Sequence, residues 1–190
     1  MVEIKIPEKD KCDLCIIDEF LSNEDFEKIK TIFTNENTPW FFSKGIAFPN
    51  DTIRETSDTG SLDDYFFSHV LYNNMRPQSD LFDNTINILG PALKQELQFQ
   101  LSTIIRIKFN LYTRTQIVNR HPWHIDAKDL PKLRGALLML NTCDGYTGFI
   151  DGTKVKSVEN RLVLFDSLEK HHSTSTSDAS TRMTININYI

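Results

Sequence analysis

Cysteine is scarce in this sequence, and long apolar runs are missing. Three cysteines among 190 residues are too few, and odd in number, for a fold held together by disulfides. The longest apolar run, residues 136–140, is far too short to cross a bilayer. Residues 1–11 mix charged and apolar side chains without the apolar core of a signal peptide. We therefore predict a cytoplasmic protein that does not act at a membrane.

Positive charge is also not in excess. The chain has 21 lysines and arginines against 26 aspartates and glutamates, which gives a formal net charge of −5. This balance argues against a nucleic-acid-binding protein that relies on a basic surface, although it leaves room for a local basic cleft. Hydrophobic residues at 39% and charged residues at 25% are typical of globular domains and exclude a mainly disordered chain.

No repeat or low-complexity linker divides the chain. Its length is that of one ordinary domain, so we predict a single domain over residues 1–190. Residues 1–100 are rich in helix and loop signals, whereas residues 101–190 consist of short strands joined by turns. We expect the second zone to form a β core that carries the chemistry, and the first zone to support it.

Two helices are predicted in the first zone. Ser22 is a favourable N-cap for a helix over residues 22–34, where apolar residues follow at helical spacing. A second apolar stripe predicts a helix over residues 79–98, which Gly90-Pro91 should kink or split. The sequence also contains two aromatic clusters, at residues 40–42 and residues 65–67. We interpret them as core side chains, with a substrate lid in this stretch as the alternative.

In the second zone, apolar and polar residues alternate with the period of a β-strand. The alternation is clearest over residues 103–112 and 182–189. The apolar face of the first strand comprises Ile105, Ile107, Phe109 and Leu111. The polar faces comprise Arg106, Lys108, Asn110 and Tyr112 on the first strand and Arg182, Thr184, Asn186 and Asn188 on the second. Further strands are predicted over residues 134–141, over residues 161–165 and in a hairpin over residues 149–155 with a type I′ Asp-Gly turn.

These polar faces are unusual because they carry specific hydrogen-bonding groups where an ordinary exposed face favours lysine, glutamate and threonine. They could instead line a wet cavity. A mainly β fold, with a sandwich or short barrel around a polar interior and helices over the outer apolar face, accounts for both strands and both helices.

The sharpest short motif is His124-Ile125-Asp126. On a strand, residues i and i+2 project to the same side, so His124 and Asp126 would share one face. A third ligand from another strand, His171 or the adjacent His172, would complete the two-histidine, one-carboxylate triad of non-haem Fe(II) oxygenases. A lone His-x-Asp is common and usually carries no metal, so the motif alone is weak.

Arg182 strengthens this interpretation. A fixed guanidinium with the hydroxyl of Thr184 on the same face is a good receptor for a carboxylate. A dicarboxylate bound to a metal at His124 and Asp126 could reach this pair with its other end. The alternative is that Arg182 makes an ordinary surface salt bridge.

The sequence resembles the Fe(II)/2-oxoglutarate-dependent dioxygenases, and most closely the compact prolyl-4-hydroxylase-like members of bacteria and phages. The resemblance covers residues 100–190 well and extends weakly to residues 16–33. Four segments carry it: His124-Ile125-Asp126, Leu138–Phe149 (LMLNTCDGYTGF), Phe165-Asp166-Ser167 before His171, and Arg182-Met183-Thr184.

The resemblance implies a double-stranded β-helix core of the jelly-roll or cupin type, with O2 as a substrate and ascorbate as a candidate reductant. It implies Fe(II) on His124, Asp126 and His171, because the residues after His171 fit the family pattern better than those after His172. It further implies that 2-oxoglutarate binds Arg182 and Thr184, with Asn110 and Tyr112 matching an Asn-x-Tyr pair of some branches, although their spacing to His124 is longer here.

Three functions remain open at this level. The first is hydroxylation of an unactivated C–H bond in a peptidyl prolyl residue, another protein side chain or a small molecule. The second is oxidative demethylation of a nucleic-acid base, which Asn110-x-Tyr112 favours and the acidic charge disfavours. The third is a non-catalytic jelly-roll binding or virion module, which the presence of the whole candidate ligand set disfavours. Specificity would lie in residues 35–100, from which no substrate can be deduced.

Overall fold

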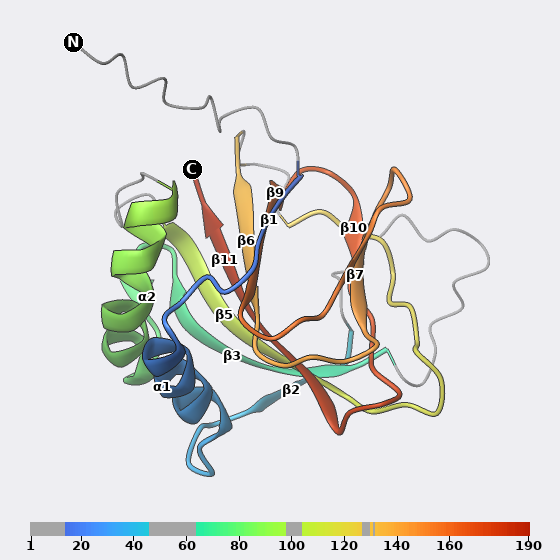
Figure 1. The fold of residues 1–190 in the computed structure, drawn as a ribbon, viewed down its shortest axis with the longest axis horizontal. Helices are drawn as coiled ribbons and strands as arrows, with labels where there is room; N and C mark the ends of the chain where they lie inside the picture. Colours follow the sequence, from blue (N-terminus) through green and yellow to red (C-terminus); the bar gives the residue numbers. More distant parts are fainter. Residues whose placement is uncertain (1–13, 46–63, 98–103, 127–129, 131) are drawn as a thin grey trace.

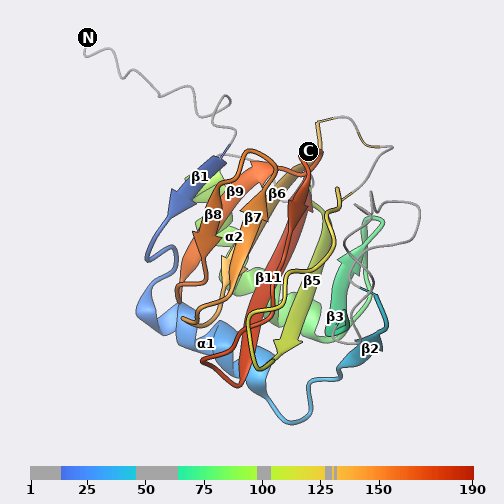
Figure 2. The same cartoon turned by 90° about the vertical axis from the view of Figure 1, so that its right-hand side faces the viewer.

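The fold consists of three layers with a large sheet in the middle, as Figures 1 and 2 show. The computed structural model describes residues 14–45, 64–97, 104–126, 130 and 132–190. Two helices cover one face of the large sheet, and a small sheet lies over the opposite face (Figure 1). The prediction of a mainly β fold with flanking helices and a jelly-roll core is therefore confirmed.

The large sheet is antiparallel and joins strands that are far apart in the sequence. Its order is β1 (Leu14–Ile17), β9 (Arg161–Asp166), β6 (Arg134–Met139), β11 (Thr181–Tyr189), β5 (Ile104–Thr113), β3 (Phe66–Asn73) and β2 (Phe41–Ser43), with β4 (Arg76–Pro77) paired to β3. The small sheet has the order β10 (His171–His172), β7 (Tyr146–Phe149) and β8 (Lys154–Lys156). The closing strand β11 lies between β5 and β6, so both polar-faced strands predicted from the sequence are neighbours in the centre of the sheet.

The two predicted helices pack against the apolar face of this sheet. Helix α1 spans Asn23–Thr34, and the Ser22 hydroxyl caps it by accepting a hydrogen bond from the Asp25 amide at 3.2 Å. Helix α2 spans Leu81–Leu97 and continues through Pro91, so the predicted split does not occur. Proline removes only one helical hydrogen bond, and the fully buried Leu89 and Leu93 on either side of it hold the helix against the core.

One hydrophobic core joins the helices to the large sheet. It contains Ile29 and Phe33 of α1, Leu89 and Leu93 of α2, Ile107 and Phe109 of β5, and Ile185 and Ile187 of β11. The alternation along β5 holds with one correction at its start. The register of β5 against β11 shifts at the Asn188/Tyr189 step, so Ile104 rather than Ile105 is the buried core residue.

The hairpin predicted over residues 149–155 exists, but its turn is not of type I′. Type I′ needs positive φ at both central residues, and in this turn only Gly152 has one, at 92°. The Gly152 amide donates to the Phe149 carbonyl at 3.0 Å, and the Phe149 amide donates to the Thr153 carbonyl at 2.9 Å. The connection is therefore a longer turn that ends in a left-handed glycine.

The aromatic clusters are only partly core. Phe66 is buried and stacks on Tyr112, with ring centroids 5.7 Å apart. Phe41 and Phe42 are each 61% exposed, so interpreting them as core side chains was wrong. They lie on β2 at the edge of the large sheet, where a strand has a neighbour on one side only. Among the described residues, no helix has the length and apolar character that a membrane span requires.

Candidate functional site

A pairing of two distant segments builds the candidate metal site. Residues 114–126 run beside residues 171–176, and isolated β-bridges join Arg114 to Thr176, Arg120 to Thr174 and His124 to His171. The last bridge is reciprocal: the His124 amide donates to the His171 carbonyl at 2.9 Å, and the His171 amide donates to the His124 carbonyl at 3.0 Å. Backbone pairing therefore sets the two imidazoles side by side, with ring centroids 4.5 Å apart.

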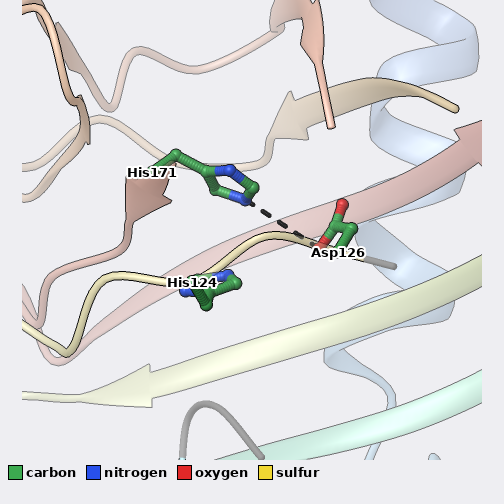
Figure 3. A group of neighbouring side chains, drawn as sticks. All are labelled: His124, Asp126 and His171. Atoms are coloured by element: carbon green, nitrogen blue, oxygen red, sulfur yellow. Dashed lines mark ion pairs between the residues drawn. The ribbon is translucent and has the colours of Figure 1, made fainter. Parts of the chain in front are cut away.

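His124, Asp126 and His171 turn their donor atoms toward one another (Figure 3). One ligand atom from each residue can be chosen so that all three lie within 4.8 Å of one another. The His171 Nε2 and the Asp126 Oδ1 are 3.9 Å apart. Two imidazoles and one carboxylate converging in this way are the donor set of a facial-triad metal site.

Backbone carbonyls orient both imidazoles. The Nδ1 of His171 lies 2.9 Å from the Glu169 carbonyl oxygen, and the Nδ1 of His124 lies 3.3 Å from the Pro122 carbonyl oxygen. Because a carbonyl only accepts, each Nδ1 must carry the proton, which leaves the Nε2 lone pair free for a metal. Burial, reinforced by the neighbouring His171, lowers the pKa of His124 to about 4, so this imidazole is neutral and able to coordinate at neutral pH.

Asp126 is held as a buried carboxylate. Its Oδ2 accepts hydrogen bonds from Asn188 Nδ2 at 2.6 Å and Ser167 Oγ at 3.3 Å, and its Oδ1 lies 3.4 Å from a guanidinium nitrogen of Arg106. Burial alone would raise the pKa of Asp126, but the nearby His171 and Arg106 outweigh it and hold this pKa well below 3.8. The carboxylate is therefore ionised and oriented before any ligand binds.

The other end of the site is a fully buried arginine. Arg182 has no exposed surface. Its guanidinium donates hydrogen bonds to the Thr174 carbonyl at 3.2 Å and to Thr147 Oγ1 at 2.8 Å. The same guanidinium lies 5.6 Å from the centre of the Tyr112 ring. None of the ion pairs among the described residues includes Arg182, and its Nε has no hydrogen-bond partner. Burial lowers the pKa of Arg182 below its usual value. A buried cation without a carboxylate partner is costly, so an anion is expected to bind there.

A cavity of about 90 Å³ between the two sheets connects Arg182 to the three candidate metal ligands. All seven residues singled out from the sequence line it: His124, Asp126, His171, Arg182, Thr184, Asn110 and Tyr112. Three buried polar atoms on lining residues have no partner in the described structure: Asn110 Oδ1, Asn186 Oδ1 and Arg182 Nε. Since buried polar groups are nearly always satisfied, this cavity has the donors and acceptors of a polar ligand site.

The polar residues of β5 and β11 form four cross-strand pairs along this cavity. The pairs are Tyr112–Arg182, Asn110–Thr184, Lys108–Asn186 and Arg106–Asn188. The first pair contains the buried arginine, and the last contains both the guanidinium and the amide that contact Asp126. The row of pairs therefore runs from the carboxylate receptor to the candidate metal ligands.

Several lining residues were not singled out from the sequence as site residues. Lys108 and Asn186 lie on the same polar faces as the predicted residues, so the period-two alternation contains the signal that could have identified them. Thr147 and Ser173 come from β7 and from the segment after β10, and no sequence pattern connects them to Arg182. The Ser173 Oγ forms a hydrogen bond of 2.8 Å with the Nδ1 of the buried His121, and the His121 ring stacks on Tyr112.

The two adjacent histidines point to different surroundings. His171 lines the cavity, whereas His172 packs edge-on against Trp123 and so close to Gly148 that a Cβ there would lie 2.3 Å from the His172 Nε2. Trp123 is thus a packing partner of His172. The assignment of His171 as a metal ligand stays a prediction.

Replacing His171 with alanine is expected to abolish specific Mn(II) binding, measured by electron paramagnetic resonance. His172→Ala is the matched control. It should keep Mn(II) binding but lower the free energy of unfolding in urea by about 1–3 kcal/mol, because it removes a buried packing side chain. Retention of metal by His171→Ala together with its loss in folded His172→Ala would assign the ligand to His172.

No protein-family model and no curated protein matches this sequence. Solved structures do match. A prolyl hydroxylase from Trichoplax adhaerens, in complex with a peptide fragment of the oxygen degradation domain of hypoxia inducible factor, aligns with a TM-score of 0.61 and 16% identity over 95% of this chain and 84% of that chain. A 2OG-Fe(II) oxygenase family protein from Burkholderia pseudomallei has a TM-score of 0.66 and 11% identity, with 95% and 86% covered.

A prolyl-4-hydroxylase from Pseudomonas putida aligns with a TM-score of 0.59 and 14% identity over 95% of this chain and 93% of that chain. At these identities the alignments establish the fold. The resemblance to prolyl-4-hydroxylase-like oxygenases that the sequence motifs indicate is therefore confirmed at the level of the fold.

Proposed function

We propose that the protein is an Fe(II)- and 2-oxoglutarate-dependent oxygenase that hydroxylates an unactivated C–H bond. One observation carries this proposal. A single small cavity joins a two-histidine, one-carboxylate donor set to a buried arginine that has no carboxylate partner among the described residues. Solved structures of the same fold with matching names support it. A protein side chain such as peptidyl proline, or a small molecule, is the proposed class of substrate.

The proposed iron ligands are His124, Asp126 and His171. Ferrous iron bound there would supply O2 activation coupled to the oxidative decarboxylation of 2-oxoglutarate to succinate and CO2. The chain contributes the ligand orientation: the Glu169 and Pro122 carbonyls hold the two imidazoles in one tautomer. Asn188 and Ser167 restrain the carboxylate, and such outer partners typically change metal affinity by about 10- to 100-fold.

Arg182 is the proposed receptor for the distal carboxylate of 2-oxoglutarate. Its guanidinium is already fixed by Thr147 and the Thr174 carbonyl, so little side-chain entropy is lost when an anion binds. Thr184 and Tyr112 line the cavity beside it and offer hydroxyl donors. A dicarboxylate would thus supply the negative charge that the buried cation lacks.

Asn110 has the right groups to orient the cosubstrate between these two ends. Its Nδ2 lies 3.4 Å from Thr184 Oγ1, while its Oδ1 has no partner. Apolar residues close the remaining walls, with Phe66 and Phe165 both buried. They exclude water, which strengthens the electrostatic interactions of Arg182 and protects reactive species from side reactions.

The test is an anaerobic titration of the metal-free protein with Fe(II) and then with 2-oxoglutarate, followed by visible absorption. A keto acid chelated to ferrous iron produces a weak charge-transfer band, so we expect a band that saturates at one equivalent of 2-oxoglutarate. Succinate, which lacks the keto group, is the control ligand and should produce none. Absence of the band in protein that circular dichroism shows to be folded would instead support a non-catalytic binding module.

A further inference from the structure

Lys108 is a further cation in the cavity that Arg106 and Arg182 also line, and the proposed function does not use it. It lies on the polar face of β5 between Arg106 and Asn110, and its side chain lines the cavity. Its Nζ sits 5.1 Å from the centre of the Phe66 ring. None of the ion pairs or side-chain hydrogen bonds among the described residues involves the Lys108 ammonium.

An unpaired lysine at this position needs an explanation. Burial, with the neighbouring Arg106, lowers the pKa of Lys108 to about 8, which still leaves the ammonium mostly charged at neutral pH. The contact with Phe66 is a modest compensation, since a methionine would pack against the same ring without desolvating a charge. A half-buried lysine facing a cavity is therefore a poor structural choice and a reasonable choice for binding an anion.

The charges of the proposed complex leave Lys108 unmatched. Ferrous iron and Arg182 together balance the charges of Asp126 and of the two carboxylates of 2-oxoglutarate. Lys108 and Arg106 then remain as positive groups beside the iron ligands, with Arg106 already 3.4 Å from Asp126. The cavity would keep an excess of positive charge until another anion enters it.

The position of Lys108 separates it from the cosubstrate receptor. It pairs with Asn186, which is one pair away from Arg106–Asn188 and two pairs away from Tyr112–Arg182. Successive residues on one face of a strand are about 6–7 Å apart. Lys108 thus lies nearer to the candidate metal ligands than to Arg182. It shares its cross-strand pair with Asn186, whose Oδ1 has no hydrogen-bond partner among the described residues.

We propose that Lys108 is a specificity-determining residue that binds a carboxylate of the primary substrate, so that the enzyme acts on an acidic compound or an acidic side chain. This inference rests on the proposed oxygenase function. Arg106, held against Asp126, adds to the positive field at the same place. A neutral substrate of the same shape would cover the half-buried Lys108 without offering it a charged partner, and this cost is the basis of discrimination.

The test compares wild type with Lys108→Met and Lys108→Arg, each loaded with Mn(II) and saturated with 2-oxoglutarate so that no turnover occurs. The probes are pairs that differ in charge and little in shape: aspartate and asparagine, glutamate and glutamine, each free and as the N-acetyl compound. Isothermal titration calorimetry measures the Kd of each probe for the saturated proteins. The Kd of 2-oxoglutarate is measured in separate titrations of the Mn(II)-loaded proteins. Lys94→Met, the same change at an exposed lysine of α2, is the control.

We expect at least one acid to bind wild type about 10-fold or more tightly than its amide, a preference that Lys108→Met loses and Lys108→Arg keeps in part. The Kd of 2-oxoglutarate should change less than about 3-fold in both variants. Equal binding of acids and amides, or no binding of any acid by wild type that binds 2-oxoglutarate, would overturn the proposal.

Two further outcomes identify where the reasoning fails. A rise of about 10-fold or more in the Kd of 2-oxoglutarate in Lys108→Met would assign Lys108 to the cosubstrate and overturn substrate recognition alone. Failure of metal-loaded wild type to bind 2-oxoglutarate at all would overturn the oxygenase function and this inference together.

Discussion

Replacing Asp126 with alanine is expected to lower Fe(II) affinity by at least about 100-fold and to abolish 2-oxoglutarate turnover. The change removes the proposed anionic metal ligand and leaves the Arg106 guanidinium and the Asn188 amide facing a vacant position. Fe(II) affinity is measured by anaerobic equilibrium titration, and turnover by succinate formation. The effect should be large because the change acts on the metal and on the charge balance together.

Asn188→Ala is the matched control for this prediction. It removes the hydrogen bond to Asp126 Oδ2 but leaves the carboxylate, so we expect a smaller loss of metal affinity, about 10- to 100-fold. A folded Asp126→Ala protein with wild-type Fe(II) affinity and turnover would contradict the assignment of the metal site.

Arg182→Met is expected to change ligand binding and stability in opposite directions. Loss of the cation should weaken 2-oxoglutarate binding by about 2–5 kcal/mol, which is a rise in Kd of roughly 30- to 4000-fold. In the ligand-free protein, methionine fills the space of a buried charge that no carboxylate of the described segments pairs with, so the free energy of unfolding should stay equal or increase. Calorimetric titration and urea denaturation measure the two quantities.

Arg182→Lys separates charge from geometry in this experiment. Lysine keeps the positive charge but cannot donate to Thr147 and the Thr174 carbonyl as a planar fork does, so binding should recover only partly. If Arg182→Met unfolded more easily and bound 2-oxoglutarate normally, Arg182 would be a structural residue and the cosubstrate site would lie elsewhere.

The alternation of residue types explains how much of this architecture the sequence could predict. Along β5 and β11, side chains at every second position face either the helices or the cavity, so strand location and orientation follow from local patterns. Helix α1 was equally predictable, because the Ser22 cap and the apolar spacing agree. The register shift that buries Ile104 was not, since a bulge depends on the partner strand.

Sequence patterns could not predict the contacts between layers. The approach of Thr147 and Ser173 to the cavity depends on how the small sheet packs over the large one, which no local period encodes. Phe41 and Phe42 are exposed because β2 is an edge strand, and this position is set by the order of the strands in the sheet. The His-x-Asp spacing could indicate which residues share a side, but the bridge between His124 and His171 joins segments on separate parts of the chain.

The alternation on β5 and β11 also has an evolutionary consequence. Core residues such as Phe109 and Ile185 interlock with the helices, so a change of volume there destabilises the whole fold. Their sequence neighbours Lys108 and Asn186 face the cavity and support no such packing. A descendant lineage can therefore acquire a new substrate by exchanging these cavity-facing residues while the selection for foldability acts on the residues between them.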